Sequence, residues 1–156
     1  MAASVTYTLV PATWRADAGV MTCPVYRVQI AWESDDAADP APGTVPAGTA
    51  VSAFTISGFL CKVTWVPDGV ATPTNLYDTT IADVLGADIL ATCPGSNCLA
   101  AGAHFRQPRA LNAAGADYVG YAPVLLYNTT LNLEVLNAGN AKKGSIYLDI
   151  VPSSTR

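Results

Sequence analysis

The sequence predicts an all-β protein, a β-sandwich of jelly-roll type with about nine short strands and little helix. Short runs of β-branched and aromatic residues alternate with polar residues, which is typical of half-buried strands. Turn-forming residues separate these runs. The 11 prolines and 12 glycines are spread along the chain and interrupt any long helix. We expect residues 1–156 to form one domain, which is long enough to bury a hydrophobic core.

The first two strands are predicted from clear alternation. Val5–Val10 alternates apolar residues with threonine. In Tyr26–Glu33, the apolar residues Val28, Ile30 and Trp32 fall on one face and polar residues fall on the other. These two segments are therefore expected to pack one face of a sheet against the core.

The later strands follow the same pattern of short runs between turn residues. The segment Ala37–Gly48, rich in proline, glycine and alanine, is expected to be the longest loop. Gly58 is expected at a bend or bulge, and Ala110–Ala116 suits either a short helix or a loop. The remaining predicted strands are Ala50–Ser57, Phe59–Val66, Tyr77–Ala82, Ala87–Ala91, Ala103–Arg106, Tyr118–Tyr127 (interrupted near Pro123), Thr130–Leu136 and Ser145–Val151.

The low charge of the chain bears on its partners. Charged residues make up 13% of the chain, about half the usual share of roughly 25%. We expect another copy or another protein to cover part of the surface; the alternative is that serine, threonine, asparagine and backbone amides cover it. The net charge is −4 and the nearest thing to a basic cluster is Lys142-Lys143, in a predicted turn. Direct nucleic-acid binding is therefore not expected.

Targeting signals are not apparent in the sequence. No run of about 20 apolar residues predicts a membrane span. The N-terminal segment MAASVTYTLVP lacks the basic and apolar regions of a secretory signal. Synthesis in a cytoplasm is the expectation, without a membrane partner.

The cysteines at positions 23, 61, 93 and 98 are expected to be reduced in that compartment. Cys61 lies in an apolar run and is predicted to be a small core residue. Cys93 and Cys98 bracket a predicted turn, Pro94–Asn97, so a disulfide formed outside the cell is an open alternative. One such pair with one histidine does not match a structural zinc site.

No catalytic constellation is apparent. His104 is the sole histidine, and the chain contains neither a Gly-x-Ser-x-Gly turn nor a glycine-rich phosphate loop. A cysteine–histidine pair lacks a third member or a local motif. We predict a structural role for His104 and no enzyme activity, and we assign no catalytic, cofactor-binding or metal-binding residue.

Two further motifs have plain structural interpretations. Asp78, Asp83 and Asp88 lie close in sequence and could bind calcium, but their spacing is not that of an EF-hand. The favoured interpretation is a turn over Asp83–Gly86, in which the aspartate side chain accepts backbone amides and the glycine adopts positive φ. The sequon at Asn128 is interpreted as a chance match.

Several segments together resemble small structural proteins of tailed bacteriophages. Thr64–Asp68, Ala71–Asp78 and Asp83–Leu90 form an ordered series: a proline-bearing loop, a Tyr-Asp strand and an Asp-x-x-Gly-x-Asp hairpin. Thr130–Asn140 and Lys142–Leu148 resemble the strand, Asn-Ala-Gly turn and strand that close such proteins. The resemblance covers mainly residues 50–92 and 118–151.

The resemblance implies a capsid decoration (cement) protein that binds the outside of the assembled head and stabilises it. It further implies a homotrimer at a symmetry axis, with the major capsid protein as partner. The implied location is the virion surface, after synthesis in the host bacterial cytoplasm. The alternatives are a head fibre, tail or receptor-binding component, or a jelly-roll capsid protein. A binding module displays clustered aromatics, whereas Trp14, Trp32 and Trp65 lie within or beside strands and are expected in the core.

Overall fold

The computed structural model describes residues 2–12, 25–36, 43–90, 95–98, 102–111 and 118–153. These residues form eleven strands and no helix. The all-β prediction is therefore confirmed for the described part of the chain. The strands are β1 (Ser4–Ala12), β2 (Val25–Glu33), β3 (Ile56–Pro67), β4 (Tyr77–Ala82), β5 (Gly95–Cys98), β6 (His104–Arg106), β7 (Arg109–Leu111), β8 (Tyr118–Tyr121), β9 (Val124–Thr129), β10 (Asn132–Leu136) and β11 (Lys143–Val151).

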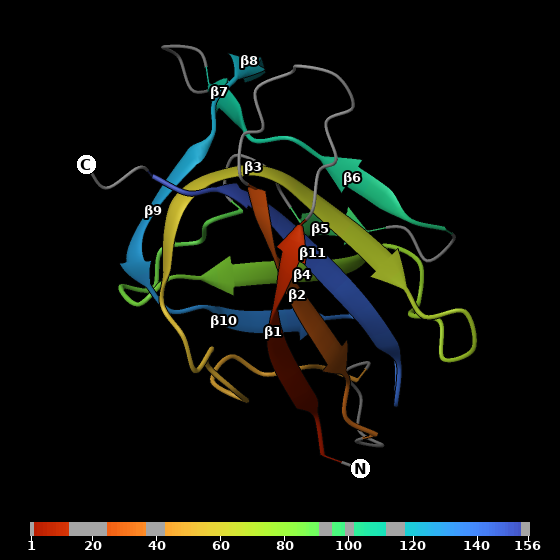
Figure 1. The fold of residues 1–156 in the computed structure, drawn as a ribbon. Helices are drawn as coiled ribbons and strands as arrows, with labels where there is room; N and C mark the ends of the chain where they lie inside the picture. The colour runs from red at the N-terminus through yellow and green to blue at the C-terminus, as the bar shows by residue number, and fades with distance from the viewer. Residues whose placement is uncertain are drawn as a thin grey trace.

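Six strands form one antiparallel sheet, called here the large sheet. Its order is β1-β2-β11-β3-β6, and β9 also pairs with β3. The 12-residue strand β3 has room for two partners on one side, because residues 56–60 pair with β9 and residues 63–65 pair with β6. β1 therefore lies at one lateral end of the sheet, and β9 and β6 share the other end (Figure 1).

Two smaller sheets complete the fold. The small sheet has the order β10-β4-β5, and β7 pairs with β8 as a separate ribbon. Figure 1 shows β4 and β10 crossing behind β1, β2 and β11. Val45 extends the small sheet through mutual backbone hydrogen bonds of 2.9 Å with Val135 in β10. The second half of the predicted Ala37–Gly48 loop is thus docked on the small sheet, while residues 37–42 lie outside the described part of the chain.

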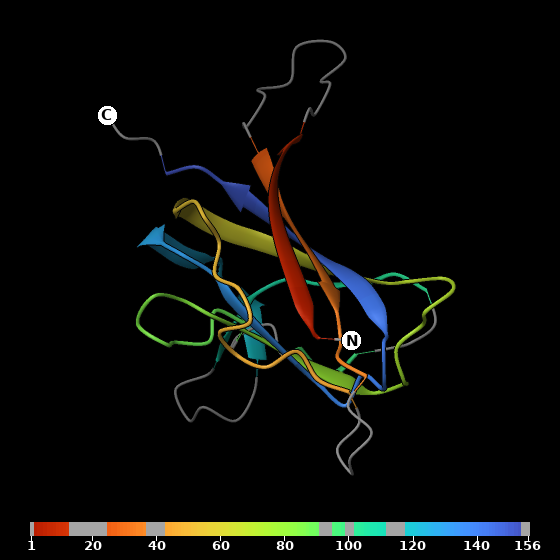
Figure 2. The ribbon, with the colours of Figure 1, turned by 90° about the horizontal axis from the view of Figure 1, so that it is seen from below.

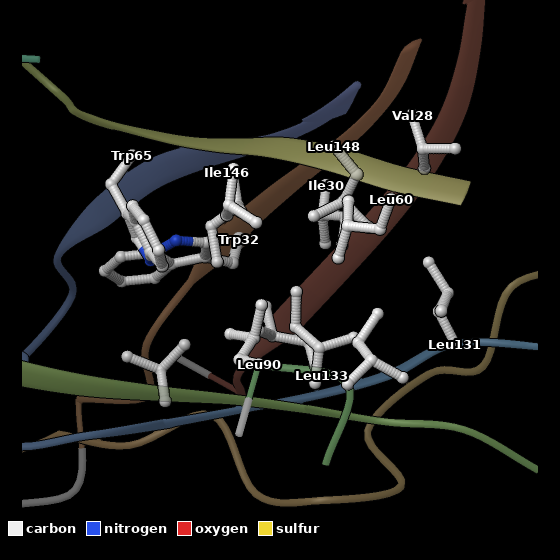
Figure 3. Packing of buried hydrophobic residues seen from close by; sticks show 14 of the residues in the cluster. Val28, Ile30, Trp32, Leu60, Trp65, Leu90, Leu131, Leu133, Ile146 and Leu148 are labelled. Atoms are coloured by element: carbon white, nitrogen blue, oxygen red, sulfur yellow. The ribbon is translucent and has the colours of Figure 1, made fainter. Parts of the chain in front are cut away.

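The core lies between the large and small sheets. Figures 2 and 3 show the two layers and the apolar side chains that point into the space between them. The alternation predicted for Val28, Ile30 and Trp32 is confirmed, since all three are buried. Burial of such side chains contributes about 1.5–3 kcal/mol each. The fully buried large side chains are Trp65, Tyr77, Ile30, Ile56, Leu60, Ile81, Leu90, Leu131, Leu133, Ile146, Leu148 and Ile150.

Two of the predicted strands are not continuous strands in the structure. Within Ala50–Ser57, Val51 makes only an isolated bridge, and continuous pairing begins at Ile56. Ser52 explains the difference, because its hydroxyl donates to Phe54 O at 2.8 Å and accepts from Leu131 N at 2.9 Å. Such side-chain bonds offer the backbone an alternative to a strand ladder.

The second wrong strand is Ala87–Ala91. Its described residues make one bridge, between Ala82 and Asp88, and continue as a turn. The Asp88 carboxylate accepts the Leu90 amide at 2.9 Å, which bends the chain two residues later. Ile89 and Leu90 are nonetheless buried, so their apolar character reflects core packing rather than a strand.

The predicted turn Pro94–Asn97 is also wrong over its described residues. Gly95–Cys98 forms β5 and pairs with β4 through Tyr77↔Cys98 and Thr79↔Gly95. Turn-forming residues adopt strand geometry here because the edge of β4 supplies a partner. Ala110 and Leu111, the described part of the predicted Ala110–Ala116 helix or loop, belong instead to strand β7, and residues 112–117 lie outside the described residues.

Gly58 confirms the predicted bulge. It has φ of 149°, and the β3–β9 register shifts between Ile56 and Gly58. A Cβ atom at this position would lie 2.4 Å from Val151 O, so only glycine allows β11 to approach so closely. The segments predicted on either side of Gly58 are therefore joined in one strand, β3.

Candidate interaction surface

His104 lies in β6 and packs against the core. Its ring stacks on Trp65 with centroids 5.3 Å apart and planes 4° from parallel. Both ring nitrogens are buried without a hydrogen-bond partner among the described residues. Burial, and secondarily the positive charge of Arg106, lower the pKa of His104. The imidazole is therefore neutral near pH 7 and contacts an indole rather than a nucleophile.

The cysteines differ in their surroundings. Cys98 is buried beside Thr79, with 3.8 Å between Sγ and Oγ1, and burial raises the pKa of its thiol to about 11. A thiol with so high a pKa stays protonated at neutral pH and is a poor nucleophile. Cys23 and Cys93 lie outside the described residues, and with Cys93 so does the alternative Cys93–Cys98 disulfide.

Cys61 is not in the core as predicted, because it occupies a second β-bulge in β3. Asp149 pairs with Lys62 and Ile150 pairs with Leu60, so Cys61 is the extra residue between two ladder pairs. It is half-buried, while Leu60 and Val63 point inward. The bulge interrupts the alternation of two and moves Cys61 out of the inward row.

The three aspartates all accept hydrogen bonds from amide groups, Asp88 from the Leu90 backbone as described above. Asp83 accepts the amides of Leu85 and Ala87, each at 2.8 Å, and Gly86 has φ of 81°. The predicted turn with a positive-φ glycine is thus confirmed. Asp78 accepts the Asn137 side-chain amide at 3.1 Å. Across the described ranges, no group of three potential metal-ligating side chains is found.

A surface hollow of about 330 Å³ lies at the end of β2, β3 and β11. Its charged side chains already have partners: Lys143 Nζ lies 3.2 Å from Glu33 Oε2, and Asp68 accepts the amides of Val70 and Ala71. Lys143, predicted to lie in a turn with Lys142, is the first residue of β11. This volume is at the lower limit for small-molecule sites, and its lining offers no unpaired charge to a ligand.

Exposed apolar side chains gather where β3 and β9 meet. Phe59 lies directly opposite Leu125 in the sheet register, and Tyr127 follows on the same face of β9. All three are exposed on the face of the large sheet that points away from the core, and Tyr127 is 82% exposed. Their neighbours Leu60 and Leu126 point inward and are buried.

The Asp83–Gly86 turn places two further exposed apolar side chains near the end of β9. Its tip carries Val84 and Leu85, and Leu85 is 88% exposed. The Val84 amide donates to Thr129 Oγ1 at 3.0 Å, which fixes the turn to the end of β9. Figures 1 and 2 both show the turn beside β9. We call Phe59, Leu125, Tyr127, Val84 and Leu85 the lateral surface; none of these side chains carries a charge.

Sequence reasoning did not find the lateral surface. Val124–Tyr127 is apolar without alternation, so both faces of β9 are apolar even though only one contacts the core. That lack of alternation in a strand at a sheet edge was the available signal. By contrast, the predicted core positions of Trp32 and Trp65 are confirmed, and Trp14 lies outside the described residues.

The described part of the chain has no helix that could cross a membrane. Comparisons with protein-family models, with curated proteins and with solved structures found no match to this chain.

Proposed function

We propose that this chain is a bacteriophage capsid decoration protein, which binds the outside of the assembled head and stabilises it. The lateral surface is the observation that carries the proposal. Exposed apolar patches on folded domains mark sites of protein contact. Leu85 and Tyr127 are the most exposed side chains of the lateral surface, and each is more than four-fifths exposed.

The low charge of the chain supports the same role. Only 13% of residues are charged, and charged residues are depleted in the buried centre of protein interfaces. A protein that binds the assembled shell and not its free subunits stabilises the shell by mass action. Many copies on one shell add avidity, so each contact can be modest. In this proposal the chain acts by binding and has no catalytic residue, and the virion surface is its location.

We further propose that the two layers form a jelly-roll-like β-sandwich and that the protein is a homotrimer. The core between the large and small sheets supports the sandwich. A trimer suits a three-fold or quasi-three-fold site on a shell. The major capsid protein is the partner that this role requires.

The copy number of the chain in purified particles tests the role. Quantitative mass spectrometry of particles from its source should find hundreds of copies per particle. A few copies would support a tail, fibre or receptor-binding component instead. Absence from particles would overturn the virion proposal.

A matched pair of variants tests the lateral surface. Leu85→Asp places a charge at the exposed tip of the Asp83–Gly86 turn and should reduce binding to preformed shells about tenfold or more, because an unpaired charge must be desolvated. Val70→Asp is the control, since Val70 is 97% exposed on a different turn. Equal binding by both variants would exclude the turn from the contact.

A further inference from the structure

Two strands at opposite ends of the large sheet contain no charged residue, although Arg106 lies in β6, which shares one of these ends. β1 at one end is Ser4–Ala12 and β9 at the other is Val124–Thr129, and neither strand contains a charged residue. Edge strands are ordinarily protected by charged residues, prolines or covering segments, because their unpaired backbone groups can pair with another chain. β1 has one proline, Pro11, next to its last residue, which leaves Ser4–Val10 without such a residue. We infer that copies of this chain associate head to tail, with β1 of one copy pairing with β9 of the next.

The exposure of Leu9 supports an added strand beside β1. Leu9 pairs with Val28, whose side chain points inward and is fully buried. Leu9 therefore faces the core side of the sheet, yet it is 53% exposed. A strand placed beside β1 would cover it. On the same face Val5 and Tyr7 already pack against the core cluster.

At the opposite end of the sheet, β9 is a better partner than β6 for β1 of a neighbouring copy. β6 is three residues long and contains Arg106 and His104. β9 is six residues long, uncharged, and pairs only with β3 among the described strands. Because Asn128 has φ of 44°, the regular part of β9 is Val124–Tyr127, about 13 Å long. The nine-residue strand β1 is long enough to match it.

The faces of the two strands also match. The core-facing side of β9 carries Leu126 and Val124, so Leu9 of the neighbouring copy would meet apolar side chains there. On the outer face, Thr6 and Thr8 would lie beside Leu125 of the lateral surface. β1 and β9 can thus pair without burying a charge, and the core-facing side of one strand continues the core-facing side of the other.

Strand direction defines the pairing. Four antiparallel steps separate β1 from β9 in the order β1-β2-β11-β3-β9, so these two strands run in the same direction. Rotation about an axis along the strands preserves that direction and makes a parallel pair. A heterologous contact of this kind generates a ring when the rotation closes. A two-fold β1–β1 contact would leave β9 uncovered, whereas the head-to-tail contact covers both edges. The ring size of three rests on the homotrimer in the proposed function.

Sedimentation equilibrium tests self-association of the full chain. The wild type should reach the mass of three chains at tens of micromolar. The Leu9→Lys variant should associate more weakly, with its trimer half-dissociated at a concentration about tenfold or more above that of the wild type. The reason is that the ammonium group would be buried in the contact. Val70→Lys, at an exposed turn away from both edges, should behave as wild type. A wild type that stays at the mass of one chain overturns the inference, and so does an unchanged Leu9→Lys variant.

Disulfide trapping tests which edges meet. Double variants that combine Thr6→Cys or Thr8→Cys with Leu125→Cys or Tyr127→Cys should give dimers and closed trimers on non-reducing gels in at least one combination. The single variants, wild type and Val70→Cys set the background from the native cysteines. Covalent dimers from Thr8→Cys alone would instead show a β1–β1 contact and overturn the head-to-tail contact.

These outcomes are distinguishable from failure of the decoration role. A monomeric chain that binds shells overturns the edge pairing and leaves decoration standing. A cross-linked ring from a chain that is absent from particles overturns decoration and leaves the edge pairing standing.

Discussion

The indole of Trp65 joins the two layers of the protein, because its Nε1 donates a hydrogen bond of 2.9 Å to Thr79 Oγ1. Trp65 belongs to β3 in the large sheet and Thr79 to β4 in the small sheet, and both are buried. The apolar core therefore contains a polar contact that joins the two sheets, as does the hydrogen bond of 2.9 Å from Leu133 N to the Tyr7 hydroxyl.

Loss of this hydrogen bond should destabilise the protein. Thr79→Val keeps the side-chain shape but leaves the buried Trp65 N–H unsatisfied, which costs about 1–3 kcal/mol of unfolding free energy. Urea unfolding followed by tryptophan fluorescence measures the change. Thr80→Val is the control, because Thr80 occupies the other face of β4. Equal stability of the two variants would contradict the prediction.

Gly144 should tolerate no side chain. A Cβ atom there would lie 2.7 Å from Trp32 Cζ2, within the buried side of the large sheet. Gly144→Ala should lower the unfolding free energy by about 1–3 kcal/mol through overpacking. Gly69→Ala should have little effect in the same denaturation assay, since no heavy atom lies within 4 Å of its added Cβ.

Gly86 should be required for its conformation rather than for space. Its φ is +81°, although no atom lies within 4 Å of the Cβ position. Gly86→Val should cost about 1 kcal/mol or more, because a β-branched residue is strained at positive φ. Thermal melts of Gly86→Val and Gly69→Val should separate this effect from a general cost of losing glycine.

The same turn should not depend on calcium. Asp83 already accepts the Leu85 and Ala87 amides, so a chelator should leave the melting temperature unchanged. A large decrease in melting temperature with chelator would establish a metal site instead.

His104 should make stability depend on pH. Burial, with a smaller contribution from Arg106, lowers the pKa of His104 in the folded state. The unfolded chain then binds a proton near pH 6.5 while the folded chain does not, so stability is full above about pH 6.5 and decreases as pH falls below it. Urea unfolding at pH 7.5 and pH 5.0 measures the loss. His104→Phe should remove most of it, because the chain has a single histidine.

Local sequence patterns determined several features correctly. The alternation at Val28, Ile30 and Trp32 placed one face of β2 in the core, since side chains alternate along a strand. Asp83 and Gly86 predicted their turn because the carboxylate can accept nearby amides and glycine readily adopts positive φ. These features depend on residues close together in the chain.

The tertiary structure decided the features that depend on distant partners. Cys61 lies outside the core because β11 pairs with β3 across a bulge at this residue. Gly95–Cys98 is a strand because it pairs with the edge of β4. The lateral surface exists because Leu125 and Tyr127 are exposed on the outer face of β9 and the Asp83–Gly86 turn is bonded to the end of that strand. The sequence by itself determined an all-β chain with apolar, weakly charged strands. Only the tertiary structure decided which strands became the sheet edges and which apolar side chains remained exposed, because pairing between strands far apart in sequence sets both.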